Sequence, residues 1–255
     1  MRFRRALLLS DIHLGWSVCT DQHEVWLERL PEAVDDAELV VLNGDVLDHH
    51  RGFFTNRERE LEQRLLELIR QFVKEGRRVV YVEGNHDVAD AERTGLLTPD
   101  RWHFDWEGAH GEQIRVLHGH RFSNETFTPG AYERFGRHLL WAENYLYATR
   151  PTVRNVYGGS IGFLVGAIGW TEDVVWKNRF PGRVQSLLTT DVLVHGHFHF
   201  GPGHWKIGKT PVWKTGAWVS HGHLGSMDRM LRYRDGKFER ITLGSKGFYA
   251  TNDGL

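Results

Sequence analysis

The sequence predicts an α/β protein whose parallel strands end in polar residues that can hold metal ions. Short apolar runs rich in Val, Leu and Ile recur along the chain, as expected of buried strands. Helix-like stretches separate the first three runs, and strands joined by such crossovers run parallel. Each run also stops at Asp, Asn or His. Open α/β sheets bind ligands outside the carboxyl ends of their strands, so we expect these polar residues to converge.

Five strands and two helices carry this pattern. The strands are expected in ALLLSDIH (6–13), LVVLNGD (39–45), RVVYVEGNHD (78–87), IRVLHGH (114–120) and VLVHGHFH (192–199). The helices are expected in EVWLERLPEAV (24–34) and in RERELEQRLLELIRQFVKEG (57–76), which Gly76 stops.

Composition narrows the class of protein. The chain has 255 residues, 40% of them hydrophobic, which suffices for a substantial core. A net charge of -1 from 32 basic and 33 acidic residues provides no global field for nucleic acid or an anionic membrane. The single cysteine, Cys19, excludes an internal disulfide and suits a reducing compartment. We therefore expect a cytoplasmic protein with no obligate nucleic-acid partner.

Two apolar stretches bear on membranes. The run ALLL (6–9) reaches Asp11 too soon to be the core of a signal peptide. The stretch IGFLVGAIGW (161–170) has ten residues, too few to span a bilayer as a helix. This pattern leaves a peripheral membrane contact open.

The polar strand ends supply a set of metal ligands. Seven nitrogen and oxygen donors are expected in one shallow bowl: Asp11, His13, Asp45, Asn85, His118, His197 and His199. If Asp45 bridges, the seven give four contacts to each of two ions. Two divalent cations, two carboxylates and one hydroxide leave roughly +1 facing the substrate, which attracts a phosphate ester. Such ions lower the pKa of bound water toward about 7, so hydrolysis of a phosphoester follows.

The blocks DIH, GDVLD, GNHD, LHGH and HGHFH, in this order between residues 11 and 199, resemble those of the calcineurin-like metallophosphoesterases. The resemblance implies a four-layer α/β/β/α sandwich, with the whole chain (1–255) as one domain. It implies a first ion held by Asp11, His13 and His199, and a second held by Asn85, His118 and His197. Asp45 would bridge them. The two divalent ions would be manganese, or iron, zinc or cobalt as alternatives.

The same resemblance assigns roles beside the ions. His86 would contact the phosphate together with Asn85 and protonate the leaving oxygen, a task that suits the pKa of an imidazole. Asp87 would orient His86. Gly196 would let the backbone approach the cluster, whereas His195 is expected to make a structural hydrogen bond. Asp48 is left open between support for the ions and a loop cap.

Residues 121–190 separate the last two ligand blocks, and this segment is much longer than a simple connection between two strands requires. We interpret it as an insertion. Helix-like stretches at 130–150 and 171–188 flank the glycine-punctuated segment 157–170, so we expect a helical cap beside the site. Arg154 and Lys177 in this cap are candidates to bind a second phosphate. An apolar cap favours a substrate with a hydrophobic portion. The alternative is that the apolar residues of the cap only pack it onto the rest of the domain.

The insertion and the C-terminal segment are similar to the branch that contains UDP-2,3-diacylglucosamine pyrophosphohydrolase, although His86 stands where that branch commonly has Arg. We predict a dinuclear-metal phosphodiesterase or pyrophosphohydrolase acting on a nucleotide-linked or lipid-linked phosphate, with a metal-bridging hydroxide as nucleophile. The alternatives are a protein or small-molecule phosphomonoesterase and a non-catalytic binding module. The sequence does not indicate the oligomeric state.

Overall fold

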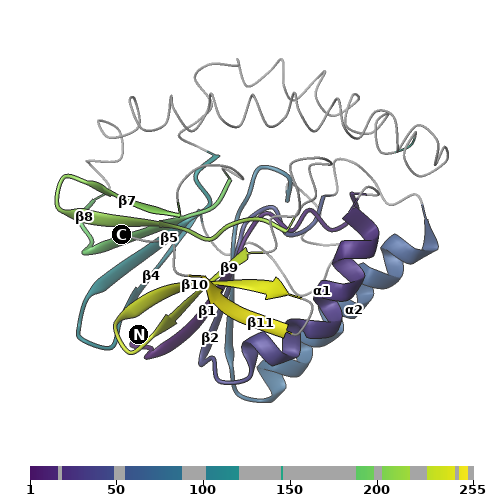
Figure 1. The fold of residues 1–255 in the computed structure, drawn as a ribbon, viewed down its shortest axis with the longest axis horizontal. Coiled ribbons are helices and arrows are strands. Elements are labelled where there is room, and N and C mark those ends of the chain that lie inside the picture. The colour runs from purple at the N-terminus through teal and green to yellow at the C-terminus, as the bar shows by residue number, and fades with distance from the viewer. Residues whose placement is uncertain are drawn as a thin grey trace.

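Two β-sheets pack face to face, and two helices cover the outer face of the first sheet (Figure 1). The computed structural model describes residues 1–16, 19–48, 55–87, 102–120, 145, 188–197, 203–218, 229–244 and 247–251. These residues supply three of the predicted layers, in the order α/β/β. The α/β metallophosphoesterase-type fold is thereby confirmed, whereas nearly all of the predicted cap (121–190) lies outside the described residues.

The first sheet has the strand order β11-β10-β9-β1-β2-β3. Its parallel half consists of β1 (Arg5–Leu9), β2 (Leu39–Asn43) and β3 (Arg78–Val82). Its antiparallel half consists of β9 (Arg229–Arg234), β10 (Lys237–Gly244) and β11 (Gly247–Thr251). The first three strands predicted to end in ligands are therefore neighbours in one sheet.

The second sheet has the order β4-β5-β6-β8-β7. The strands β5 (Gln113–Leu117), β6 (Val192–His195) and β8 (Thr210–Lys214) are parallel. The edge strands β4 (His103–Glu107) and β7 (His204–Ile207) pair antiparallel with β5 and β8. The last two predicted ligand strands, β5 and β6, are thus neighbours in this sheet.

The helices begin and end for local reasons. The helix α1 (Thr20–Val34) starts four residues before the predicted stretch. The helix α2 (Asn56–Lys74) begins with a capping box. The backbone N–H of Glu58 donates to the side-chain oxygen of Thr55, and the backbone N–H of Thr55 donates to the Glu58 carboxylate. Gly76 follows its end with φ +86°, which confirms the predicted stop.

Each parallel strand of the first sheet is apolar on both faces because both faces are covered. Leu7 and Leu9 pack with the helices, on the outer side of the sheet. Ala6 and Leu8 pack between the two sheets, where Trp106 also lies. This double burial explains why the strands read as continuous apolar runs. None of the described helices is both long and apolar enough to cross a membrane.

Candidate metal centre

The predicted ligands follow the carboxyl ends of parallel strands in both sheets. Asp11 and His13 follow β1, Asp45 follows β2, His118 follows β5 and His197 follows β6. All five side chains are mostly buried, and their donor atoms form two overlapping groups that could each hold an ion. The first group joins Asp11, His13 and Asp45, and the second joins Asp45, His118 and His197.

Asp45 belongs to both groups. Its Oδ2 lies 3.2 Å from Nε2 of His118 and 3.8 Å from Nε2 of His13. The His118 and His197 rings are 5.3 Å apart between centroids. One carboxylate oxygen therefore faces nitrogen donors from both sheets, as a bridging ligand would.

Hydrogen bonds at Nδ1 aim the Nε2 atoms of two histidines. Nδ1 of His118 donates to the carbonyl oxygen of Asn43, at 2.8 Å. Nδ1 of His13 lies 3.1 Å from Oδ2 of Asp48. A partner at Nδ1 fixes the tautomer and leaves Nε2 as the lone-pair donor, which is how metal-binding histidines are usually held.

Four of these residues have left-handed backbones. The angle φ is +53° at Asp11, +51° at His13, +52° at Asp45 and +68° at His197. Such values strain residues other than glycine and persist where surrounding contacts impose them. Here Asp11 N–H donates to the carbonyl oxygen of Gly44 at 3.0 Å, and His13 N–H donates to that of Asp45 at 2.9 Å. The strain coincides with the donors, which indicates that their directions are imposed.

Two glycines permit the close approach of the loops. A Cβ on Gly44 would lie 2.8 Å from Cβ of His118 and would overlap its ring. A Cβ on Gly196 would overlap Oγ of Ser10 and lie 2.9 Å from Oδ2 of Asp11. The predicted close approach at Gly196 is therefore confirmed.

The electrostatics of the centre favour a cation. Burial raises the pKa of Asp45, but His118 and two further histidines outweigh it and hold that pKa well below its usual range. Burial lowers the pKa of His118, yet the carboxylates of Asp45 and Asp11 raise it to about 10. The carboxylates thus draw positive charge to this position. Divalent cations could take the place of the proton, because metal binding displaces protons from its ligands. The donor set fits divalent metal ions.

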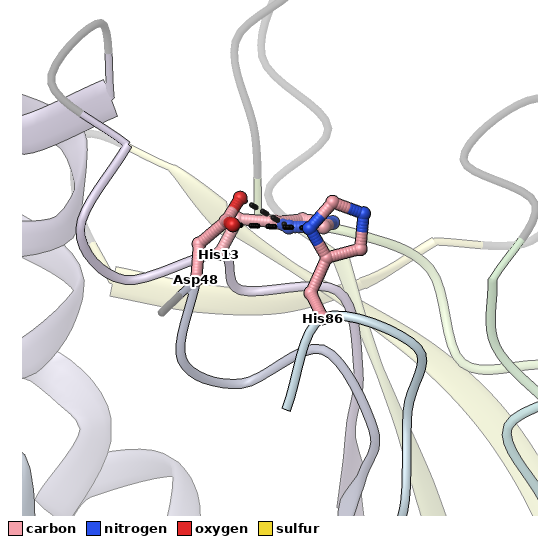
Figure 2. Close-up of side chains that lie close together, drawn as sticks. All are labelled: His13, Asp48 and His86. Carbon is pink, nitrogen blue, oxygen red and sulfur yellow. Dashed lines mark hydrogen bonds and ion pairs between the residues drawn. The ribbon is translucent and has the colours of Figure 1, made fainter. Parts of the chain in front are cut away.

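Asp48 joins a proposed ligand to His86 (Figure 2). Its Oδ2 contacts Nδ1 of His13, and its Oδ1 lies 3.0 Å from Nδ1 of His86. The His86 backbone N–H also donates to Oδ1 of Asp45, at 2.8 Å. In Figure 2 the other ring nitrogen of His86 points away from Asp48. Of the two alternatives left open for Asp48, support for the site is therefore the one that these contacts favour.

Asp87 does not take the place predicted for it. Its carboxylate accepts hydrogen bonds from four backbone N–H groups, those of Asp45, Val46, Leu47 and Gly84. Burial, followed by the nearby charge of Asp45, raises the pKa of Asp87 to about 6. Asp87 thus holds the loop that carries Asp45, and the carboxylate that orients His86 belongs to Asp48. The sequence did not distinguish the roles of Asp48 and Asp87, because both residues lie within the recognised blocks GDVLD and GNHD.

His195 is fully buried, and its Nδ1 donates to the carbonyl oxygen of Gly196 at 2.8 Å. Burial, followed by the charge of Lys214, lowers its pKa to about 3. The expected structural hydrogen bond is confirmed.

Asn85 lies half-buried in the loop after β3, beside His86. His199, Arg154 and Lys177 lie outside the described residues, so their assignments stay predictions.

Several solved structures are similar to this chain. Vacuolar protein sorting 29 from Cryptosporidium parvum is 14% identical, with 98% of this chain and 96% of that chain covered and a TM-score of 0.47. A predicted phosphoesterase from Streptococcus pneumoniae TIGR4 is 16% identical, with 98% and 99% covered and a TM-score of 0.42. A dimetal phosphatase from Danio rerio is 13% identical, with 94% and 99% covered and a TM-score of 0.39. No curated protein matches the chain.

A family model also matches the sequence of this chain. The model of the calcineurin-like phosphoesterases matches residues 4–206, which is more than half of the chain. The matched range begins before Asp11 and ends after His199, so it contains every predicted ligand. Because this match agrees with a donor set suited to divalent cations, the chain belongs to the calcineurin-like phosphoesterase family of metal-dependent hydrolases.

Proposed function

We propose that the protein uses two divalent ions to hydrolyse a phosphodiester or pyrophosphate in a nucleotide-linked or lipid-linked substrate. The observation that carries the two-ion part is the position of Asp45 Oδ2, which faces Nε2 of both His13 and His118. A centre for one ion would not require a carboxylate between two groups of donors. Apart from the shared Asp45, the described donors of the first group follow a strand of the first sheet, and His118 and His197 follow strands of the second.

The proposed ligands divide between the ions. Asp11, His13 and His199 hold the first ion, whereas Asn85, His118 and His197 hold the second, with Asp45 shared. Imidazole, carboxylate and amide donors without thiolates suit manganese, which we take as the first choice, and also suit iron, zinc or cobalt.

The bound ions supply a hydroxide nucleophile at neutral pH and a positive clamp for the phosphate. His86 supplies the proton. Its Nδ1 is engaged by Asp48, so the remaining nitrogen, Nε2, is the one that can donate to the leaving oxygen. The fully buried carboxylate of Asp48 stabilises the protonated ring and holds its direction. Asp87 acts one step further away, because it holds the loop of Asp45.

The substrate class rests on the insertion in the sequence. Residues 161–170 are mostly apolar in sequence and would suit an acyl chain, and Arg154 and Lys177 would supply positive charge for a second phosphate. Such a substrate would bring a cytoplasmic protein to the membrane surface without a spanning segment. A lipid-linked phosphate is therefore the favoured partner, and no nucleic acid is required.

The test combines metal analysis with a substrate panel. The purified protein is expected to contain two divalent ions per chain and to lose activity when a chelator removes them. The panel compares a phosphomonoester, a phosphodiester and an acylated UDP-sugar. Faster turnover of the monoester than of both other substrates would contradict the proposal, as would a metal-replete protein that hydrolyses none of them.

We expect His86→Ala to keep both ions and to slow the hydrolysis of esters with poor leaving groups by about 10²-fold, the usual range for a lost general acid. Activated aryl esters leave without a proton and should slow much less. Steady-state rates on a series of leaving groups, with the metal content of each preparation, check this. Equal losses across the series would instead indicate a role in phosphate binding alone.

A second prediction concerns the insertion. Burial of an acyl chain contributes about 25 cal/mol for each Å² removed from water, so a tail could add several kcal/mol to binding. Replacing residues 161–170 by a short polar linker should therefore reduce turnover of an acylated UDP-sugar far more than that of a small chromogenic phosphodiester. Both rates are measured on folded, metal-replete protein. Equal reductions would remove the lipid part of the proposal.

A further inference from the structure

A histidine of α1 reaches the loop that carries the first pair of proposed ligands. His23 is 1% exposed, and its Nε2 lies 2.6 Å from the carbonyl oxygen of Ile12. Ile12 stands between Asp11 and His13, so this hydrogen bond joins the helix to the Ile12–His13 peptide, which leads into the second of the two ligands. Neither the metal set nor the proton donor includes His23.

The loop needs such a restraint because both of its ligands are left-handed, with φ of +53° at Asp11 and +51° at His13. An L residue avoids this region unless surrounding contacts impose it. A rotation of the peptide that joins Ile12 to His13 would change ψ of Ile12 and φ of His13, so it would turn the two ligands relative to each other. The bond from His23 acts on that peptide.

Other contacts hold the neighbouring carbonyl groups of the loop. The carbonyl oxygen of Asp11 accepts from Trp218 N–H at 3.0 Å, and that of His13 accepts from Trp16 N–H at 3.0 Å. These two donors are backbone groups. The carbonyl oxygen of Ile12 instead receives a side-chain donor, so its restraint depends on the identity of residue 23.

A histidine is an unusual choice for this side of α1, which packs mainly apolar residues such as Trp26, Leu27 and Leu30 against the sheet. Burial is the main cause that lowers the pKa of His23, to about 4. The neutral ring carries one N–H, and the short contact to the Ile12 carbonyl oxygen locates that proton at Nε2. An apolar residue would suit the packing, so the hydrogen bond is what distinguishes histidine here.

We propose that His23 is a positioning residue for the first ion: its hydrogen bond to Ile12 sets the directions in which Asp11 and His13 present their donor atoms. The inference rests on the proposed function only in requiring that the centre binds two ions. It assigns His23 no contact with the substrate or with the ions.

The test measures the affinity of each ion separately, by calorimetric titration of metal-free protein with Mn²⁺. A His118→Ala background removes a ligand of the second ion, so binding at the first position can be followed alone. A His13→Ala background isolates the second position in the same way. His23→Leu is placed in each background. This substitution is expected to lower the affinity for the first ion about tenfold, as the loss of other groups that orient metal ligands does. The affinity for the second ion should change by less than about twofold.

Two further variants separate positioning from stability. His23→Gln places an amide N–H the same number of bonds from Cα and should restore most of the affinity. Leu30→Ala removes buried packing two turns along the same helix, so it should lower the unfolding temperature of the metal-free protein while both affinities stay unchanged. Should His23→Leu fail to fold, His23→Met removes the same donor with a side chain that adapts to the space.

Equal affinities for His23→Leu and its background at the first position would overturn the proposal while leaving the two-ion function standing. So would a similar loss at both positions, or a similar loss in Leu30→Ala, since either would indicate general loosening. A parent protein that binds no divalent ion would overturn the proposed function and this inference together.

Discussion

Replacing Asp45 by Asn is expected to reduce the bound metal from two ions per chain to one or none and to lower kcat/KM by about 10³-fold, or about 4 kcal/mol of transition-state stabilisation. The Asp45 carboxylate is the charge that faces both His118 and His13. Its removal leaves each group of donors without the anion they share. Elemental analysis and steady-state kinetics on the same preparations check both expectations.

Asn is a sharper test than Ala at this position. Residue 45 has φ +52°, a conformation that Asn tolerates better than Ala, so the Asn variant removes charge with little added backbone strain. The chain also offers a matched control. Asp235 has φ +46° and forms an exposed ion pair with Arg4, so Asp235→Asn makes the same chemical change with little expected effect. Two ions and full turnover in Asp45→Asn would contradict the assignment of Asp45 as the bridge.

Replacing Gly196 by Ala is expected to remove metal and activity as completely as the loss of Asp45, and to lower the free energy of unfolding by about 1 to 3 kcal/mol. The added Cβ would overlap Oγ of Ser10 and lie 2.9 Å from Oδ2 of Asp11. That oxygen also accepts the backbone N–H of His197, at 2.9 Å. The strand end must therefore move away from Asp11, and His197 moves with it.

Chemical denaturation of the metal-free variant, together with its metal content, tests this expectation. Gly76→Ala is a suitable control. Its φ of +86° makes Ala unfavourable by roughly 1 to 2 kcal/mol, but no atom lies within 4 Å of the new Cβ. The control should lose stability and keep both ions. If Gly196→Ala binds two ions with the affinity of the parent, the close approach at Gly196 is not needed for the centre.

The strands and the positions of the ligands could be predicted from the sequence because their signals are local. An apolar run such as residues 6–9 marks a strand that is buried on both faces, and the polar residues directly after it stand at the carboxyl end. Parallel strands bring such ends to one side of the fold. Asp11 and Asp45 could therefore be placed together without knowledge of the packing.

The division of the strands between two sheets was decided by the tertiary structure. The strands β2 and β5 are both followed by proposed ligands, yet β2 joins the first sheet and β5 joins the second. Leu39 and Val41 of β2 pack in the same core as Ile114 and Val116 of β5, so the apolar residues of a strand do not indicate which of the two sheets it joins. The edge strand β4 has a mixed burial pattern, which explains why its periodicity did not identify it.

The tertiary structure also decided which carboxylate supports His86. Asp48 and Asp87 both lie in recognised blocks, and Asp87 is the nearer in sequence. The direction of each side chain depends on the fold of its loop. Asp87 turns toward backbone N–H groups of the Asp45 loop, whereas Asp48 reaches Nδ1 of His86. The sequence by itself determined which residues stand at the strand ends, because each follows directly after a run that forms a buried strand. The directions of the ligand side chains depended on left-handed loop backbones, which long-range hydrogen bonds impose. No local sequence pattern encodes those hydrogen bonds.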